Sequence, residues 1–133
     1  MFPFNAWLQS HIDDYRATLR DATMEMYMAE VNLDNPNSDI THIRSYYLSG
    51  MKMVELSQRY GDDDSYLLAL IKMHHRLIRE INNPRRCHLC RLQSYHFGRQ
   101  TLQLICNQFS QQGCWQKVTA FQADFAKRVA FMP

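Results

Sequence analysis

The sequence predicts an all-α fold, a helical bundle of about three long helices followed by two shorter helices. Three observations lead to this prediction. Apolar residues recur every three or four positions through most of the chain, which is the spacing of one helix face. No stretch alternates apolar and polar residues as a half-buried strand would. The 133 residues include only 4 Gly and 4 Pro, which predicts short connections between the helices.

The composition is that of a soluble globular protein, because hydrophobic residues make up 46% of the chain and charged residues 21%. A chain of this length can bury a core of its own. No apolar run approaches the length of a membrane span, and residues 1–10 lack the basic start and apolar stretch of a secretory signal. We therefore expect an intracellular protein, in the cytoplasm or nucleus, that does not contact a membrane.

The first helix is expected over residues 5–33, where apolar residues recur at alternating spacings of four and three. The seam that they form consists of Leu8, Ile12, Tyr15, Leu19, Ala22, Met26, Ala29 and Leu33. A seam of this kind packs either against other helices of the same chain or against a second copy. The bundle core is the commoner case, and a homodimer through this helix is the alternative.

The second helix is expected from about residue 40 to residue 60. A stretch of turn-forming residues around Pro36 precedes it, and Gly61 ends it. Gly50 lies inside this helix, where a glycine lowers helix stability. We therefore expect Gly50 to mark a close crossing with the first helix.

The third helix is expected to follow the acidic residues 62–64, which suit the positive end of a helix dipole, and to end at Pro84. His74 lies on its apolar face. A buried, hydrogen-bonded histidine is expected at this position rather than a metal ligand. Two shorter helices should follow, over about 101–109 and 114–131, joined by a turn that contains Gly113. Two helices joined by a short turn could form a DNA-binding helix-turn-helix.

All four cysteines lie between Arg85 and Cys114. Cys87 and Cys90 form a C-x-x-C motif, which lets two thiolates bind one tetrahedral ion from a single turn. The sequence therefore predicts a structural Zn²⁺ site that pins a turn between the helical body and the last two helices. The two remaining ligands would come from His96, Cys106 and Cys114, either as four cysteines or as three cysteines with His96.

Three other uses of the cysteines remain open. Cys106 is in helical register with apolar neighbours, so it could be a buried thiol without a ligand. Two disulfides would require an oxidising compartment. A redox-active C-x-x-C is the third alternative, although that motif usually follows a strand and no strand is expected before Cys87.

The segment LLALIKMHHRLIRE, followed by CHLC and two later cysteines, resembles the C subunit of the bacterial flagellar master activator. In that family a helix leads into a zinc-binding tail with four cysteines. The resemblance covers less than half of this chain. Cys106 and Cys114 also depart from the closing C-x-x-C of the family, so we assign no family from it.

Charge is distributed unevenly along the chain. Residues 1–84 contain 8 Lys and Arg against 12 Asp and Glu, and residues 85–133 contain 7 against 1, so the two parts carry −4 and +6. We therefore divide the chain into a helical body, 1–84, and a basic region with Cys and His, 85–133, within one compact domain. A basic region of this kind is typical of nucleic-acid contact, although the two parts could simply attract each other or a partner subunit. The expected phosphate contacts are Arg85, Arg86, Arg91, Arg99, Lys117, Lys127 and Arg128.

No phosphate-binding loop, dinucleotide-binding motif or nucleophile elbow occurs in the sequence. Residues 85–123 contain no Asp or Glu, so a zinc ion there would have no carboxylate as general base. We expect a non-enzymatic, zinc-stabilised regulatory protein that binds nucleic acid through its basic C-terminal third, as a DNA-binding transcriptional regulator. The alternative is a protein-binding adaptor, inhibitor or chaperone that acts through Met- and aromatic-rich helix faces.

Overall fold

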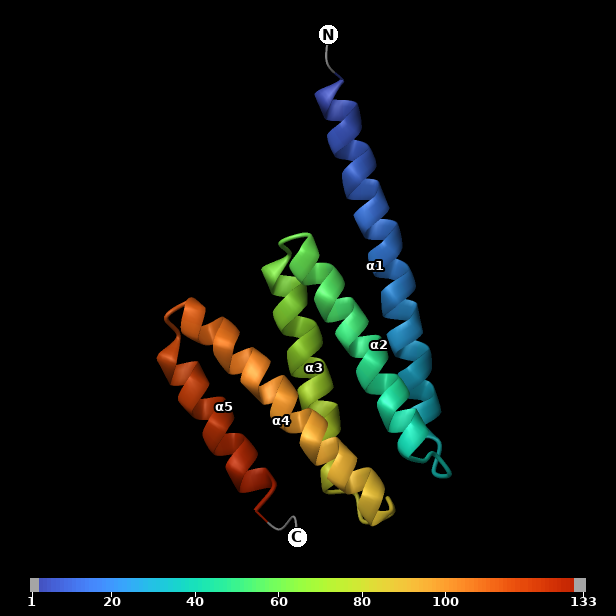
Figure 1. Cartoon of the computed structure of the whole chain (residues 1–133), viewed down its shortest axis with the longest axis vertical. Coiled ribbons are helices and arrows are strands. Elements are labelled where there is room, and N and C mark those ends of the chain that lie inside the picture. The colour runs from blue at the N-terminus through green and yellow to red at the C-terminus, as the bar shows by residue number, and fades with distance from the viewer. Residues whose placement is uncertain (1–2, 131–133) are drawn as a thin grey trace.

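The computed structural model describes residues 3–130 (Figure 1). This part of the chain is helical and contains no strand, which confirms the predicted all-α class. The five helices are α1 (Phe4–Asp34), α2 (Ile40–Arg59), α3 (Asp63–Ile81), α4 (His88–Gln111) and α5 (Trp115–Arg128). None of the helices within residues 3–130 is both long enough and apolar enough to cross a membrane.

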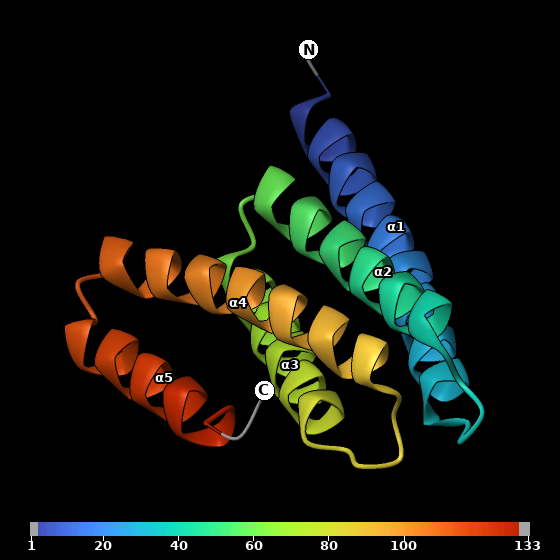
Figure 2. The ribbon, with the colours of Figure 1, turned by 60° about the horizontal axis from the view of Figure 1, so that its bottom comes forward.

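Successive helices run in opposite directions, and α3 packs against both α2 and α4, which also contact each other (Figures 1 and 2). The interface between α3 and α4 is the most extensive one between any two helices. At the centre of the main core, Leu70, Met73 and Leu77 of α3 are completely buried, together with Tyr46 of α2 and Ile105 of α4. This core therefore joins residues from both sides of the expected boundary at residue 84.

The seam on α1 has two different environments. Its C-terminal half, Ala22 to Leu33, is buried, which agrees with the expected bundle core. Its N-terminal half is less buried, and Leu8, in the part of α1 that extends beyond α2, is 38% exposed (Figure 1). Trp7 stacks on His11 within α1, and His11 and Tyr15 both lie against the ring of Tyr60 at the end of α2.

Gly50 lies at a crossing with α3 and not, as expected, with α1. A β-carbon placed at Gly50 would overlap with Sδ of Met73, which is completely buried. The sequence could show that a close approach was needed, but not which helix made it.

We expected a zinc-pinned turn followed by a short helix over about 101–109. Residues 88–111 instead form one helix, α4, which is longer than α3 and has Cys87 as its N-cap. The expected end of the last helix at residue 131 lies outside the described residues. In both views α4 and α5 run side by side in opposite directions, as a helical hairpin rather than a helix-turn-helix (Figures 1 and 2).

His74 is completely buried between α3, α4 and α5, as expected from its position on the apolar face of α3. Its Nδ1 lies 2.9 Å from Oγ1 of Thr101, and its ring lies against Phe121 and Phe125. Nε2 has no hydrogen-bond partner among residues 3–130. Burial disfavours the charged imidazolium and lowers the pKa of His74 to about 4.

The buried His74 should make the protein sensitive to mild acid. Because its pKa is lower in the folded chain than in the unfolded chain, unfolding takes up a proton as the pH falls from about 6.5 to about 4. The free energy of unfolding should therefore decrease across this window, by up to about 3 kcal/mol in total. Urea titrations at several pH values measure this loss.

The variant His74→Gln, which cannot titrate, should lose less stability across the same window than the wild type. His88 at the start of α4 is exposed, so His88→Gln should retain the wild-type dependence on pH. Parallel curves for the wild type and His74→Gln would show that His74 is not the group responsible.

Candidate functional site

Cys87 and Cys90 lie together at the start of α4. Cys87 is the N-cap of this helix, and its Sγ accepts a hydrogen bond from the backbone N–H of Cys90 at 3.3 Å. The two Sγ atoms are 2.8 Å apart. Cys87 is exposed to solvent, whereas only 1% of Cys90 is exposed.

The two thiols of this pair differ in acidity. Hydrogen bonds from the thiol and the backbone N–H of Cys90 lower the pKa of Cys87 below its usual value. Burial, together with the hydrogen bond and the charge of Cys87, raises the pKa of Cys90 to about 11. The exposed thiol is therefore the more readily ionised one of the two, and its thiolate is the better nucleophile and metal ligand.

The other predicted zinc ligands lie away from this pair. Cys106 is buried near the end of α4, with its Sγ 4.0 Å from the carbonyl oxygen of Val118, and burial raises its pKa. Cys114 is the N-cap of α5, and His96 is exposed on α4. At about 1.5 Å of rise per residue, the 16 positions from Cys90 to Cys106 span roughly 24 Å of helix.

A single tetrahedral ion cannot bind two ligands that are separated by this length of helix. Among residues 3–130, no group of three or more His, Cys, Asp or Glu side chains is arranged to hold a metal. The four-ligand site within one chain therefore does not fit this arrangement. Zinc binding by Cys87 and Cys90 alone, completed by ligands from elsewhere, stays a prediction.

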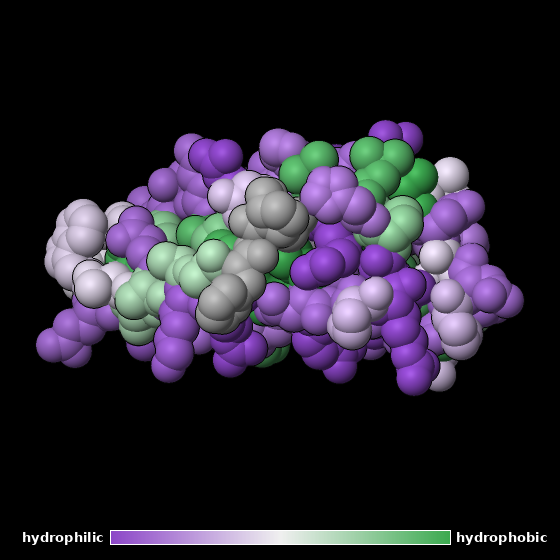
Figure 3. Space-filling view, turned by 90° about the horizontal axis from the view of Figure 1, so that it is seen from below, coloured by the Kyte–Doolittle hydropathy of each residue, from purple (hydrophilic) through white to green (hydrophobic). Residues whose placement is uncertain are grey.

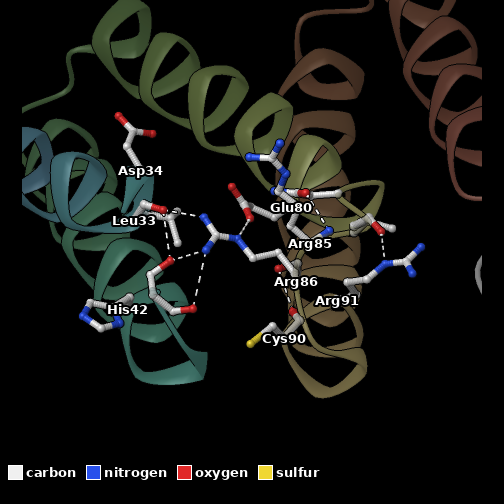
Figure 4. Close-up of polar contacts among 12 residues, drawn as sticks. Leu33, Asp34, His42, Glu80, Arg85, Arg86, Cys90 and Arg91 are labelled. Carbon is white, nitrogen blue, oxygen red and sulfur yellow. Dashed lines mark hydrogen bonds and ion pairs between the residues drawn. The ribbon is translucent and has the colours of Figure 1, made fainter. Parts of the chain in front are cut away.

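Arg86, which directly precedes the cysteine pair, is buried in an ionic cluster (Figure 4). Its Nε donates to Oε2 of Glu80 at 2.6 Å, and Arg76 donates to the other oxygen of the same carboxylate at 3.1 Å. Arg86 also donates from its Nη atoms to the carbonyl oxygens of Leu33 and Asn35 at the end of α1. These contacts join the ends of α1 and α3 to the loop before α4.

The molecular surface at this end of the bundle is largely hydrophilic, with smaller apolar patches (Figure 3). Arg86 is only 9% exposed, so it is not placed to bind a phosphate, and we leave it out of the proposed surface below. Arg91 is half-buried and donates to the carbonyl oxygen of Ile81, and Arg128 pairs with Asp124. The four other predicted phosphate contacts are exposed: Arg85, Arg99, Lys117 and Lys127.

A groove of about 570 Å³ lies between α4 and α5. Arg99 is the one predicted phosphate contact among its described lining residues. Other polar groups along its walls are His96, Gln100, Gln103, Asn107 and Gln122. Phe125 and Cys106 are buried residues that line the same groove. No carboxylate is among the described residues that line the groove.

Gln103 and Asn107 were not predicted as site residues. They follow Arg99 at intervals of four, so all three lie on one face of α4. This spacing is visible in the sequence, but it could be noticed only once α4 was known to include Arg99. Glu80 was not predicted for a different reason. The division at residue 84 placed Glu80 in the acidic part of the chain and its partner Arg86 in the basic part.

Comparisons of the chain with protein-family models, with curated proteins and with solved structures found no match.

The ionic cluster should contribute strongly to stability. In Glu80→Gln the buried guanidinium groups of Arg76 and Arg86 lose their common counter-charge, and we expect a loss of about 3 kcal/mol in the free energy of unfolding. Chemical denaturation followed by circular dichroism measures this change. Glu55→Gln removes an exposed carboxylate from α2 and should change stability by less than about 0.5 kcal/mol. Equal losses in the two variants would contradict a special role for the cluster.

Proposed function

We propose that this protein binds nucleic acid along the groove between α4 and α5, with a regulatory role such as the control of transcription. The observation that carries the proposal is a groove lined by Arg99 and several amide side chains, with no carboxylate among its described lining residues. Arginine contacts phosphate and guanine, and the amides of Asn and Gln match the edge of adenine.

The side chains of α4 have separate roles in this proposal. Arg99 binds a phosphate, and the Arg99 guanidinium already lies over the ring of Tyr95, 5.9 Å from its centre, which limits its freedom before binding. Gln103 and Asn107 contact base edges. With one predicted phosphate contact in the groove, binding should depend on hydrogen bonds as well as on charge.

The change that tests this proposal is Arg99→Gln. We expect weaker binding to all sequences and a decrease of roughly one unit in the slope of log affinity against log salt, because one phosphate contact is lost. Fluorescence anisotropy with labelled duplex DNA, single-stranded DNA and single-stranded RNA, beginning at low salt, gives both quantities.

Arg59→Gln is the matched control, since it removes the same charge from an exposed position on α2. It should leave the salt slope unchanged. If the wild type binds none of the three probes at low salt, the proposal is wrong.

A second candidate function, binding another protein, is favoured by the exposed face of α1. Seven of the eleven exposed large hydrophobic residues in the described part of the chain belong to this helix. Four of them, Met24, Tyr27, Met28 and Val31, are spaced as one helix face, on the side opposite the buried residues Ala22 to Leu33. Such an apolar stripe on a helix is a common protein-binding surface.

The occupant that we propose for this stripe is a second copy of α1, in antiparallel orientation. Pairing centred at residue 25 places Arg16 opposite Asp34 of the second copy, and Arg20 opposite Glu30. Opposite charges would therefore flank the apolar contact on both sides of its centre, although Asp34 and Glu30 also contact Arg76 within the chain.

Met24→Glu should convert a dimer into a folded monomer, because it places a charge in the middle of the apolar contact. Size-exclusion chromatography with light scattering measures the mass, and circular dichroism checks the fold. Leu68→Glu is the control, since Leu68 on α3 is 70% exposed and lies outside the stripe. A wild type that remains monomeric at all concentrations would rule out self-association through α1.

A further inference from the structure

The geometry at the start of α4 points to a chemical activity that does not depend on nucleic-acid binding. We propose that Cys87 and Cys90 form a dithiol that reduces disulfide bonds by thiol–disulfide exchange. The substrate is an accessible disulfide, carried either by a small peptide such as oxidised glutathione or by another protein.

The first reason is the separation of the two sulfur atoms. Their Sγ atoms are 2.8 Å apart, whereas a disulfide bond is about 2.0 Å long. The bond can therefore form through a movement of roughly 1 Å, without unfolding the first turn of α4.

The second reason is that the two thiols differ in access. Cys87 is exposed and can meet a substrate, whereas Cys90 is buried behind it at one turn of helix. Leu89, between them, is 58% exposed and offers an apolar contact beside the reactive sulfur. This arrangement assigns the first attack to Cys87 and the second to Cys90.

The third reason is that the local structure holds the pair in place. Sγ of Cys87 accepts the backbone N–H of Cys90 in the first turn of α4. The buried side chain of Arg86 and the contact from Arg91 to Ile81 hold the loop and the first turn in place. The pair is therefore held in one geometry before any substrate arrives.

The reaction proceeds in two exchanges. The Cys87 thiolate attacks one sulfur of the substrate, so that a mixed disulfide forms and the other substrate sulfur leaves as a thiolate. Cys90 then loses its proton to solvent and attacks Sγ of Cys87, which forms the Cys87–Cys90 disulfide and releases the second substrate thiolate. Two electrons and two protons pass in total from the dithiol to the substrate, which becomes two thiols.

Trapping the mixed disulfide tests this proposal. In Cys90→Ala the second exchange cannot occur, so reduced full-length protein mixed with oxidised glutathione should accumulate glutathione on Cys87. We expect Cys87 to react at least about tenfold faster than Cys114, which is the other cysteine that is not buried. The wild type should instead give the Cys87–Cys90 disulfide, and peptide mass spectrometry separates the two products.

A parallel experiment with insulin distinguishes the two sources of substrate. Trapping of insulin on Cys87 would show a protein substrate, and trapping of glutathione alone would show a small one. Cys87→Ala should trap either probe only at the slower rate of Cys114, and a variant with both Cys106→Ala and Cys114→Ala should react like the wild type.

Three results would overturn the proposal. One is the absence of trapping with both probes in a Cys90→Ala protein that is folded by circular dichroism. The second is equal reaction of Cys87 and Cys114. The third is a zinc ion, bound by Cys87 and Cys90 in the purified wild type, that prevents both exchanges until it is removed by a chelator.

Discussion

The buried contact between Glu80 and Arg86 is the interaction on which the arrangement of this molecule depends. A carboxylate that is 3% exposed is strongly destabilising unless both of its oxygens find partners, and here each oxygen accepts from a different arginine. Arg86 then donates to the backbone carbonyls of Leu33 and Asn35 at the end of α1, which also accept hydrogen bonds from Ser38. The Arg86 side chain thus binds groups at the C-terminal ends of both α1 and α3, and it holds the loop from which α4 begins.

The start of α4 determines the geometry of both candidate sites. Because Arg86 is held inside the fold, the next residue, Cys87, is placed at the N-cap, and one helical turn brings Cys90 beneath it. The groove uses the later turns of the same helix, with Gln103 roughly 20 Å beyond Cys90 at 1.5 Å per residue. The two sites are therefore separate in space, although one rigid helix carries both.

The sequence could predict the first three helices because apolar residues recur on each of them at helical spacing, as in the seam from Ala22 to Leu33. The first half of α4 lacked this signal. Its buried positions are Cys90, Ser94, Gly98 and Thr101, which are small or polar residues and form no hydrophobic stripe. They are buried because they allow neighbouring helices to approach closely. A β-carbon at Gly98 would lie 3.3 Å from the ring of Phe125. A hydropathy pattern does not reveal a helix face whose residues are buried because they are small.

Charge counting had a similar weakness. It assigned Arg86 to a basic surface, because a sum over residues 85–133 cannot show that its counter-charge is Glu80, on the other side of the division. The alternative explanation of the charge asymmetry was attraction between the acidic and basic parts of the chain. This attraction explains the buried position of Arg86. The remaining exposed cations are spread over α4, α5 and the preceding loop, and Arg99 alone among the predicted phosphate contacts lines the groove. Recognition at the groove must therefore depend more on the hydrogen bonds of its amide side chains than on net charge. The affinity for nucleic acid should accordingly fall only slowly with salt, although the C-terminal region is basic.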